Sequence, residues 1–196
     1  MYNAAAGWLV RYRNNFKDKP MYLGIDPGQT GGLALLSAGG DILRLEKFDH
    51  KDSAMIVKSV VQSLPAARIP GGLVIGVELV HAMPGQGVSS MFTFGLGLGR
   101  IHGVLIGLTE AWTNVSPQAW QRYLPESEAP KGRIMAFAAE RWGPHLFILS
   151  GCRVPHAGAL DAAGIAEYMR RVTLGELQAP ATKAKTTKLR ELKLGA

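Results

Sequence analysis

The sequence has little cysteine and no long apolar run, and each shortage excludes a class of protein. Cys152 is the only cysteine in 196 residues, which excludes an internal disulfide and a multi-cysteine zinc site and favours a reducing compartment. No uninterrupted apolar run reaches the roughly 18 residues of a membrane-spanning helix, and the start lacks a signal-peptide pattern. We therefore expect a soluble, cytoplasmic or otherwise intracellular protein with no membrane partner.

Positive charge is concentrated at the two ends of the chain. The formal net charge is +7, of which residues 1–20 contribute +3 and residues 178–196 contribute +4, so that residues 21–177 sum to zero. This pattern predicts a flexible basic extension over 1–20, one globular domain over 21–177 and a disordered basic tail over 178–196. Two basic arms suit a polyanion such as nucleic acid, whereas solvated tails that only aid solubility are the alternative.

Hydrophobic periodicity and turn residues predict an α/β domain with the element order β-β-β-α-β-α-β-α. This order indicates a mixed five-stranded sheet with helices on both faces, in which the first and fourth strands lie adjacent and parallel. Strands are expected near 22–26, 32–38, 41–48, 73–79 and 111–115, and helices near 51–64, 88–109, 131–142 and 159–173, with a short helix beginning at Ser116-Pro117.

Two apolar strands each end in one acidic residue. Asp26 ends Met21-Tyr-Leu-Gly-Ile-Asp, and Glu78 ends Gly72-Leu-Val-Ile-Gly-Val-Glu. Side chains alternate along a strand, so each acid shares its face with a glycine two residues earlier, which we expect to leave room for a cation or a substrate backbone. Neighbouring strands lie about 4.8 Å apart, so the two carboxylates could share metal ions. Two acids that cap nearby helices are the alternative.

Glycines recur every four residues in the long helix expected near 88–109. Gly95, Gly99, Gly103 and Gly107 line one stripe, and each lowers helix stability by about 1 kcal/mol relative to alanine. Close approach of another backbone would compensate. That backbone could be a strand of the same domain or the partner helix of a dimer.

Three segments together resemble the RuvC-like Holliday junction resolvases, especially their phage and organellar branches. They are Gly-Ile-Asp-Pro-Gly-Gln-Thr-Gly-Gly at 24–32, Val-Glu-Leu-Val-His-Ala-Met-Pro-Gly-Gln-Gly-Val-Ser-Ser-Met-Phe-Thr-Phe-Gly at 77–95, and His-Ala-Gly-Ala-Leu-Asp-Ala-Ala-Gly-Ile-Ala at 156–166. The resemblance spans about residues 21–172. It implies a ribonuclease-H-like fold, a homodimer, and nicking of symmetric strands at a four-way DNA junction with two Mg²⁺ ions, for which Mn²⁺ could substitute.

The resemblance also assigns the site residues. Asp26 and Glu78 match the two strand acids of the family, and Asp161 matches the acid that opens its last helix. Taken alone, Asp161 at a helix N-terminus could equally be a plain N-cap. Many relatives place a further acid three or four residues before it; here His156 stands five residues before, and we expect it to be the fourth metal ligand, although capping of a turn is the alternative.

Residues that contact DNA are expected in two places. The loop after Glu78 is rich in glycine and could approach DNA closely. Lys131 resembles a basic catalytic position of the family near the active site, where its ammonium would offset charge on the phosphate, although an exposed charge in the first turn of a helix is the alternative. Phe92 and Phe94 are expected in the core more than as wedges between bases. The predicted DNA contacts are His81, Met83, Gln86, Lys131 and Arg133.

Two other function classes compete with a nuclease. Sugar kinases and actin-like ATPases use a related turn of acid and glycines to hold phosphates, but they duplicate the domain and need a second phosphate loop, which this chain lacks. A non-catalytic branched-DNA-binding module would not need the three acids. The sequence therefore predicts a metal-dependent endonuclease that resolves four-way or other branched DNA junctions.

Overall fold

The computed structural model describes residues 19–64, 72–79, 85, 87–108, 110–126 and 130–178, with the side chains of 130 and 131 excepted. Nearly all of the predicted extension and tail therefore lies outside the described residues. The strands are β1 Met21–Asp26, β2 Thr30–Leu36, β3 Ile42–Asp49, β4 Leu73–Glu78 and β5 Trp112–Val115. The helices are α2 Ser53–Ser63, α3 Val88–Gly107, α4 Pro117–Gln121, α5 Pro130–Arg141, the 3-10 helix η1 Pro144–Phe147 and α6 Ala157–Thr173.

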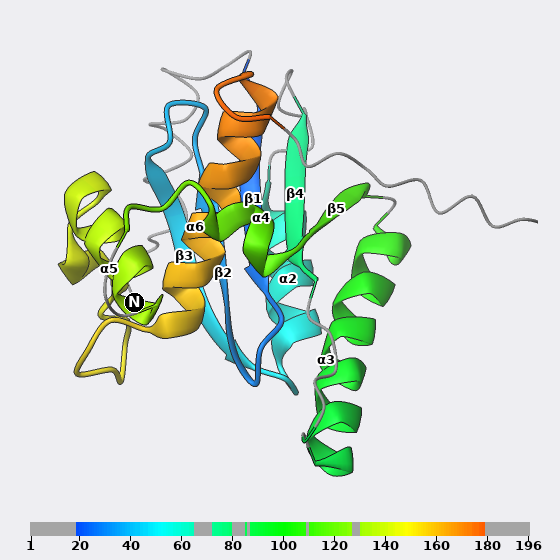
Figure 1. Cartoon of the computed structure of the whole chain (residues 1–196). Coiled ribbons are helices and arrows are strands. Elements are labelled where there is room, and N and C mark those ends of the chain that lie inside the picture. Colours follow the sequence, from blue (N-terminus) through cyan, green and yellow to red (C-terminus); the bar gives the residue numbers. More distant parts are fainter. Residues whose placement is uncertain are drawn as a thin grey trace, which may run out of the picture.

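The five strands form one mixed sheet in the order β3-β2-β1-β4-β5 (Figure 1). β1, β2 and β3 are antiparallel neighbours, whereas β1 pairs with β4 and β4 pairs with β5 in parallel. The register joins Ile25 to Val77, so the next residues along, Asp26 and Glu78, end adjacent strands at the same edge of the sheet. The predicted element order and the parallel pairing of the first and fourth strands are confirmed.

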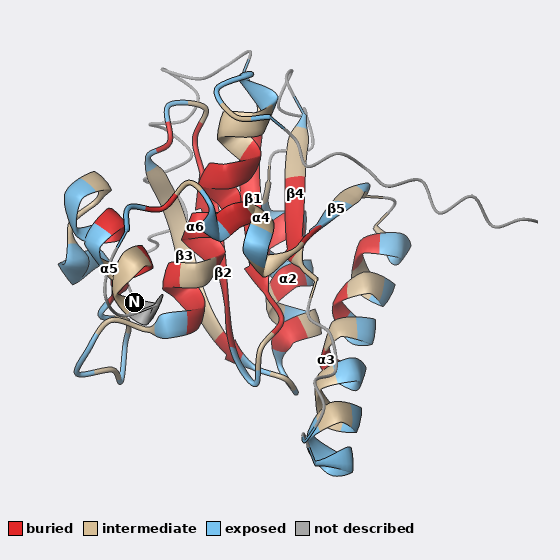
Figure 2. Ribbon diagram, viewed as in Figure 1, coloured by how far each residue is buried: buried red, intermediate tan, exposed pale blue. Residues whose placement is uncertain are grey.

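Side chains that alternate along β1 pack in two separate hydrophobic cores, one on each face of the sheet. Leu23 and Ile25 are fully buried in the core shared with α2 and α3, whereas Tyr22 is buried on the opposite face with α4, α5 and α6. Buried positions accordingly run through the central strands and along α6 (Figure 2). Helices cover both faces of the sheet, as the sequence predicts. Within the described residues no helix has the length and apolar character needed to cross a bilayer.

Helix α6 packs directly on the backbone of the central strands. A Cβ atom added to Gly24 would overlap the carbonyl oxygen of Ala162, and one added to Gly32 would overlap the backbone of Gly158. The expectation that Gly24 leaves room for a cation or a substrate is therefore wrong. The missing side chains let a helix of the same chain approach, which buries more apolar surface than an open face would.

The outer face of α3 is not covered by the part of the chain that the structure describes. A Cβ added to any of the four spaced glycines would meet none of the described atoms within 4 Å, whereas Gly97, on the opposite side of the helix, would meet His50 at 3.4 Å. The intramolecular explanation of the glycine stripe therefore fails for the described residues. Phe92, expected in the core, is 72% exposed on the same outer face, and Phe94 is half-buried.

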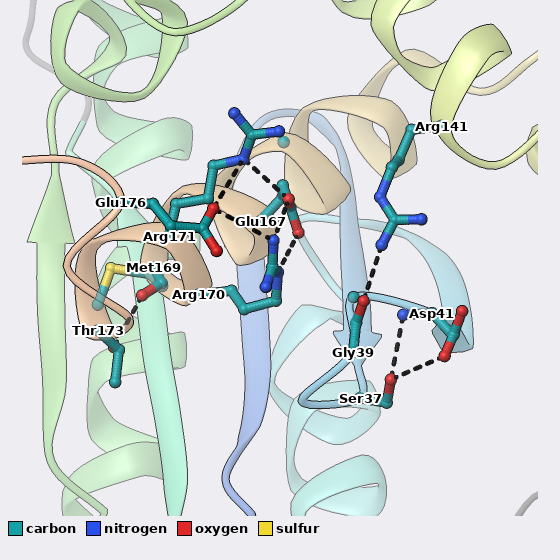
Figure 3. A network of polar contacts seen from close by, with 12 residues as sticks. Ser37, Gly39, Asp41, Arg141, Glu167, Met169, Arg170, Arg171, Thr173 and Glu176 are labelled. Carbon is teal, nitrogen blue, oxygen red and sulfur yellow. Dashed lines mark hydrogen bonds and ion pairs between the residues drawn. The ribbon is translucent and has the colours of Figure 1, made fainter.

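A buried ion-pair network fixes the C-terminal half of α6 (Figure 3). Glu167 has a fully buried side chain, and its carboxylate accepts hydrogen bonds from Arg170 at 2.7 and 2.9 Å and from Arg171 at 3.0 Å. Burial raises the pKa of Glu167, but these bonds and charges outweigh it and hold that pKa below its ordinary value. A charge without such partners would be strongly unfavourable here, so the network makes the burial of Glu167 on α6 possible.

Candidate functional site

Asp26 is a buried carboxyl group at the edge of the sheet where β1 ends. Its residue is 8% exposed, and one oxygen accepts a hydrogen bond of 2.9 Å from the backbone N–H of Gly28, in the turn that follows. Burial, the nearby Glu78 carboxylate and Asp161 together raise the pKa of Asp26 to about 8, against the lowering effect of the Gly28 hydrogen bond. A buried acid facing two like charges is typical of a functional site rather than of core packing.

Glu78 is held by a tryptophan on α4, the short helix that follows β5. Trp120, in α4, is 1% exposed, and its indole N–H donates a 2.9 Å hydrogen bond to Oε1 of Glu78. Burial raises the pKa of Glu78, and the Trp120 hydrogen bond opposes that rise. One carboxylate oxygen is therefore fixed in orientation by the indole.

Asp161 comes to the acidic edge on α6, but not as an N-cap. The helix begins at Ala157, two residues earlier than expected, so Asp161 is its fifth residue and lies in the second turn. The alternative of a plain N-cap is therefore wrong. Because glycines on β1 and β2 admit the backbone of α6, the helix lies near enough for the charge of Asp161 to raise the pKa of Asp26.

His156 is the residue that caps α6. Its Nδ1 accepts a 3.2 Å hydrogen bond from the backbone N–H of Ala159. Burial, and then the charge of Lys47, lower the pKa of His156, which favours a neutral ring. A neutral imidazole has one acceptor nitrogen, so in this arrangement Nε2 carries the proton. The alternative that His156 caps a turn is thus realised, and ligation of a metal through Nε2 requires another tautomer.

The donor set suits a hard divalent cation. Asp26, Glu78 and Asp161 offer carboxylate oxygens, which Mg²⁺ and Mn²⁺ prefer. Burial, and then the charges of Glu78 and Asp161, raise the pKa of Asp26, and a bound cation would favour its ionised form. Among the described residues, however, no group of three or more Asp, Glu, His or Cys side chains converges closely enough to hold one ion. Glu78 and Asp161 therefore each lie within electrostatic reach of Asp26, without forming a closed coordination shell with it.

The predicted DNA contacts are only partly described. Arg133 donates to three backbone carbonyls, those of Gln121, Leu124 and Pro125, and so ties the end of α4 to α5. These hydrogen bonds give the guanidinium of Arg133 a structural role. A contact between Arg133 and DNA stays a prediction. Lys131 belongs to the first turn of α5, with its side chain outside the described set. His81, Met83 and Gln86 lie outside the described residues altogether.

Two side chains near the site were missed by the sequence analysis. Trp120 is 42 residues from Glu78 in sequence, yet β5 pairs in parallel with β4 and the short step into α4 returns to the same sheet edge. Lys47, on β3, donates to Cys152 Sγ at 3.5 Å and affects His156 electrostatically. Neither residue belongs to a local sequence motif. Only the order of the strands in the sheet could have indicated that either lies near the site.

The arrangement defines a ribonuclease-H-like α/β domain with acids at the ends of the two central parallel strands. Comparison with solved structures agrees with this class. RuvC of Thermus thermophilus in complex with a Holliday junction substrate superposes with a TM-score of 0.59 and 17% sequence identity, over 79% of this chain and 96% of that one. A second T. thermophilus RuvC structure gives a TM-score of 0.56 and 18% identity over the same shares. No protein-family model and no curated protein sequence matches the chain. The fold is therefore RuvC-like.

Proposed function

We propose that the protein is a metal-dependent endonuclease that cuts branched DNA, with four-way junctions as its principal substrate. The supporting observation is the buried Asp26 carboxyl at the end of β1, whose pKa is raised by burial and by Glu78 and Asp161. The RuvC-like fold brings these acids together from three distant segments. The solved neighbour bound to a Holliday junction makes branched DNA the first substrate to test.

The carboxylates of Asp26, Glu78 and Asp161 would hold the ions. Divalent ions bound there would lower the pKa of a water molecule and neutralise charge on the scissile phosphate and the leaving 3′ oxygen. Around them, the Gly28 N–H orients Asp26 and the Trp120 indole orients Glu78. In its capped state, His156 offers an Nε2–H donor that could contact a phosphate oxygen.

The test is cleavage of a synthetic four-way junction, compared with linear duplex of the same sequence. We expect paired nicks at the branch with Mg²⁺ or Mn²⁺ and none with EDTA. Asp26→Asn should lose at least about 10³-fold in cleavage rate, because it removes a charged ligand, while junction binding persists. Asp49→Asn is the matched control, since Asp49 lies at the exposed end of β3. Junction binding by the wild type without metal-dependent cutting would favour the non-catalytic module.

Symmetric cutting requires two sites, and we propose a homodimer formed through the outer face of α3. Val88, Phe92, Leu96 and Ile106 are exposed there, interleaved with the four glycines that meet no described atom. An exposed apolar face of this kind marks an interaction surface. The glycines would allow the backbones of two α3 helices to approach closely, which offsets their low helix propensity.

The dimer is tested by light scattering coupled to size-exclusion chromatography. We expect a dimer for the wild type and a monomer for Ile106→Asp, because burying an unpaired carboxylate in an apolar interface is unfavourable. Met55→Asp is the matched control: Met55, on α2, is 75% exposed and lies off the α3 face. A dimer that survives Ile106→Asp, or is lost equally in Met55→Asp, would place the interface elsewhere.

A further inference from the structure

Lys47 places its ammonium beside the start of α6. It lies on β3, whose neighbouring residues show the orientation: Leu45 packs on the α6 face of the sheet, and Phe48 is buried on the opposite face. Side chains alternate along a strand, so Lys47 points to the α6 face. There its Nζ lies 3.5 Å from Cys152 Sγ and would lie 3.5 Å from a Cβ added to Gly151.

The strand register aligns Lys47 with the acidic site. Lys47 pairs with Gly32 across β2 and β3, and Gly32 pairs with Asp26 across β1 and β2. All three residues therefore lie in one row across the sheet, on the same face. Gly32 contributes no side chain to this row, so the row runs from a cation on β3 to a carboxyl group on β1, with the first turn of α6 above it.

The ammonium has no partner of opposite charge within the described part of the chain. The ion pairs found there involve Arg44, Arg170 and Arg171, but not Lys47. Lys47 is half-buried, and a thiol is only a weak hydrogen-bond acceptor. A partly buried cation is unfavourable unless it is paired. An anion from outside the chain would supply that pairing.

We propose that Lys47 binds a DNA phosphate next to the scissile phosphate at the acidic edge, and so positions the strand along the edge of the sheet where β1 and β3 end, beside the start of α6. This inference rests on the proposed function, because it assumes that a DNA backbone passes the acidic edge. Lys47 is a positioning residue for a phosphate, and the chemistry stays with the carboxylates. Its location on a rigid strand fixes the spacing between the two phosphates more closely than a residue in a flexible tail would.

The test is the salt dependence of junction binding, measured by fluorescence anisotropy on the full chain from about 50 to about 200 mM KCl. Each phosphate contact contributes about 0.9 to the slope of log affinity against log salt. We expect Lys47→Met to reduce that slope by about 1 and to weaken binding about tenfold at the lowest salt. Lys47→Arg keeps the cation and should keep the wild-type slope.

The matched control is Lys58→Met, since Lys58 is exposed on α2, on the opposite face of the sheet. It should leave both slope and affinity unchanged. A wild-type slope in Lys47→Met overturns the proposal, as does an equal loss in Lys47→Arg, which would indicate a packing role. If the wild type binds junctions but does not cut them, the catalytic proposal fails while the slope still decides the role of Lys47. If the wild type binds no branched DNA, both proposals fail.

Discussion

The two faces of the sheet are built in opposite ways. On the α6 face, glycines at Gly24, Gly32 and Gly76 lie under the helix, and contact is largely between α6 and the strand backbones. On the other face, branched and aromatic side chains such as Leu23, Ile25 and Phe48 interdigitate with α2 and α3. Backbone contact fixes a helix more tightly than flexible side chains do. The helix on the face that carries the acids is therefore held more tightly than the helices on the other face.

The largest effect should come from a single methyl group on the α6 face. Gly24→Ala places a Cβ against the carbonyl oxygen of Ala162 and forces α6 off the sheet. We expect a loss of about 4 kcal/mol in the free energy of unfolding, measured by urea denaturation. Ile25→Val, the neighbouring residue on the other face, should cost only about 1 kcal/mol. Equal losses would contradict the proposed difference between the faces.

Breaking the buried network on α6 should be the next largest effect. Glu167→Gln leaves the guanidinium groups of Arg170 and Arg171 without their carboxylate, and we expect a loss of about 3 kcal/mol. Arg44, whose ion pair with Glu46 is partly exposed, offers the control: Glu46→Gln should cost less than about 1 kcal/mol.

The same network gives a pH dependence with a definite sign. The pKa of Glu167 lies below its ordinary value of 4.5 in the folded protein. Its stabilisation is therefore fully present above 4.5 and is lost as pH falls through the lowered folded-state pKa. Unfolding free energies measured from pH 6 downward, with pH about 4.5 as the start of the fall, should decrease more steeply for the wild type than for Glu167→Gln. Parallel curves would contradict this assignment.

A smaller effect is expected at the hydrogen bond that orients Glu78. Trp120→Phe keeps the aromatic packing but removes the indole N–H. We expect metal activation of cleavage to need about 10- to 100-fold more Mg²⁺, in a variant that still folds. Trp142→Phe is the matched control, because the Trp142 indole donates instead to the carbonyl of Gly40, at the far end of β2. If both variants needed the same increase in Mg²⁺ concentration, the result would contradict an orienting role for Trp120.

The smallest effect is expected on the outer face of α3. Gly99→Ala adds a methyl group where no described atom lies within 4 Å, so the isolated chain should gain about 0.5 to 1 kcal/mol from improved helix propensity. The dimer should weaken at the same time, because the methyl would separate the two helices. Gly97→Ala, whose Cβ would meet His50 at 3.4 Å, should leave the dimer unchanged. Stronger dimerisation of Gly99→Ala would contradict packing of the glycines at the interface.

Local patterns predicted the elements well because each has a local cause. Ser116 and Pro117 predicted the start of α4, and the Ser116 hydroxyl does accept a hydrogen bond from the Ala119 N–H. The start of α6 was misplaced because His156, an unusual N-cap, provides the capping acceptor. Phe92 was assigned to the core because periodicity identifies an apolar face of a helix without indicating what covers it.

For the candidate site too, local patterns predicted some features and not others. Asp26 and Glu78 could be predicted as neighbours, since strand order and period-2 alternation place two strand-terminal acids together. The meaning of the glycines could not, because the same absence of a side chain can admit an ion, a substrate or a helix. Trp120 joins the site because β5, the strand before α4, pairs with β4, which is far away in sequence. Lys47 joins it through the register that runs across β1, β2 and β3, on which local periodicity carries no information.

The sequence by itself determined the order of strands and helices, the parallel pairing of β1 with β4 and the meeting of two acids at one edge, because these follow from alternation and connection rules. Only the tertiary structure decided that α6 fills the glycine-lined face, that Asp161 lies in its second turn, and that Trp120 orients Glu78. These features depend on which backbones come into contact. That contact is set by the packing of the whole domain, so it cannot be predicted from any local segment of the sequence.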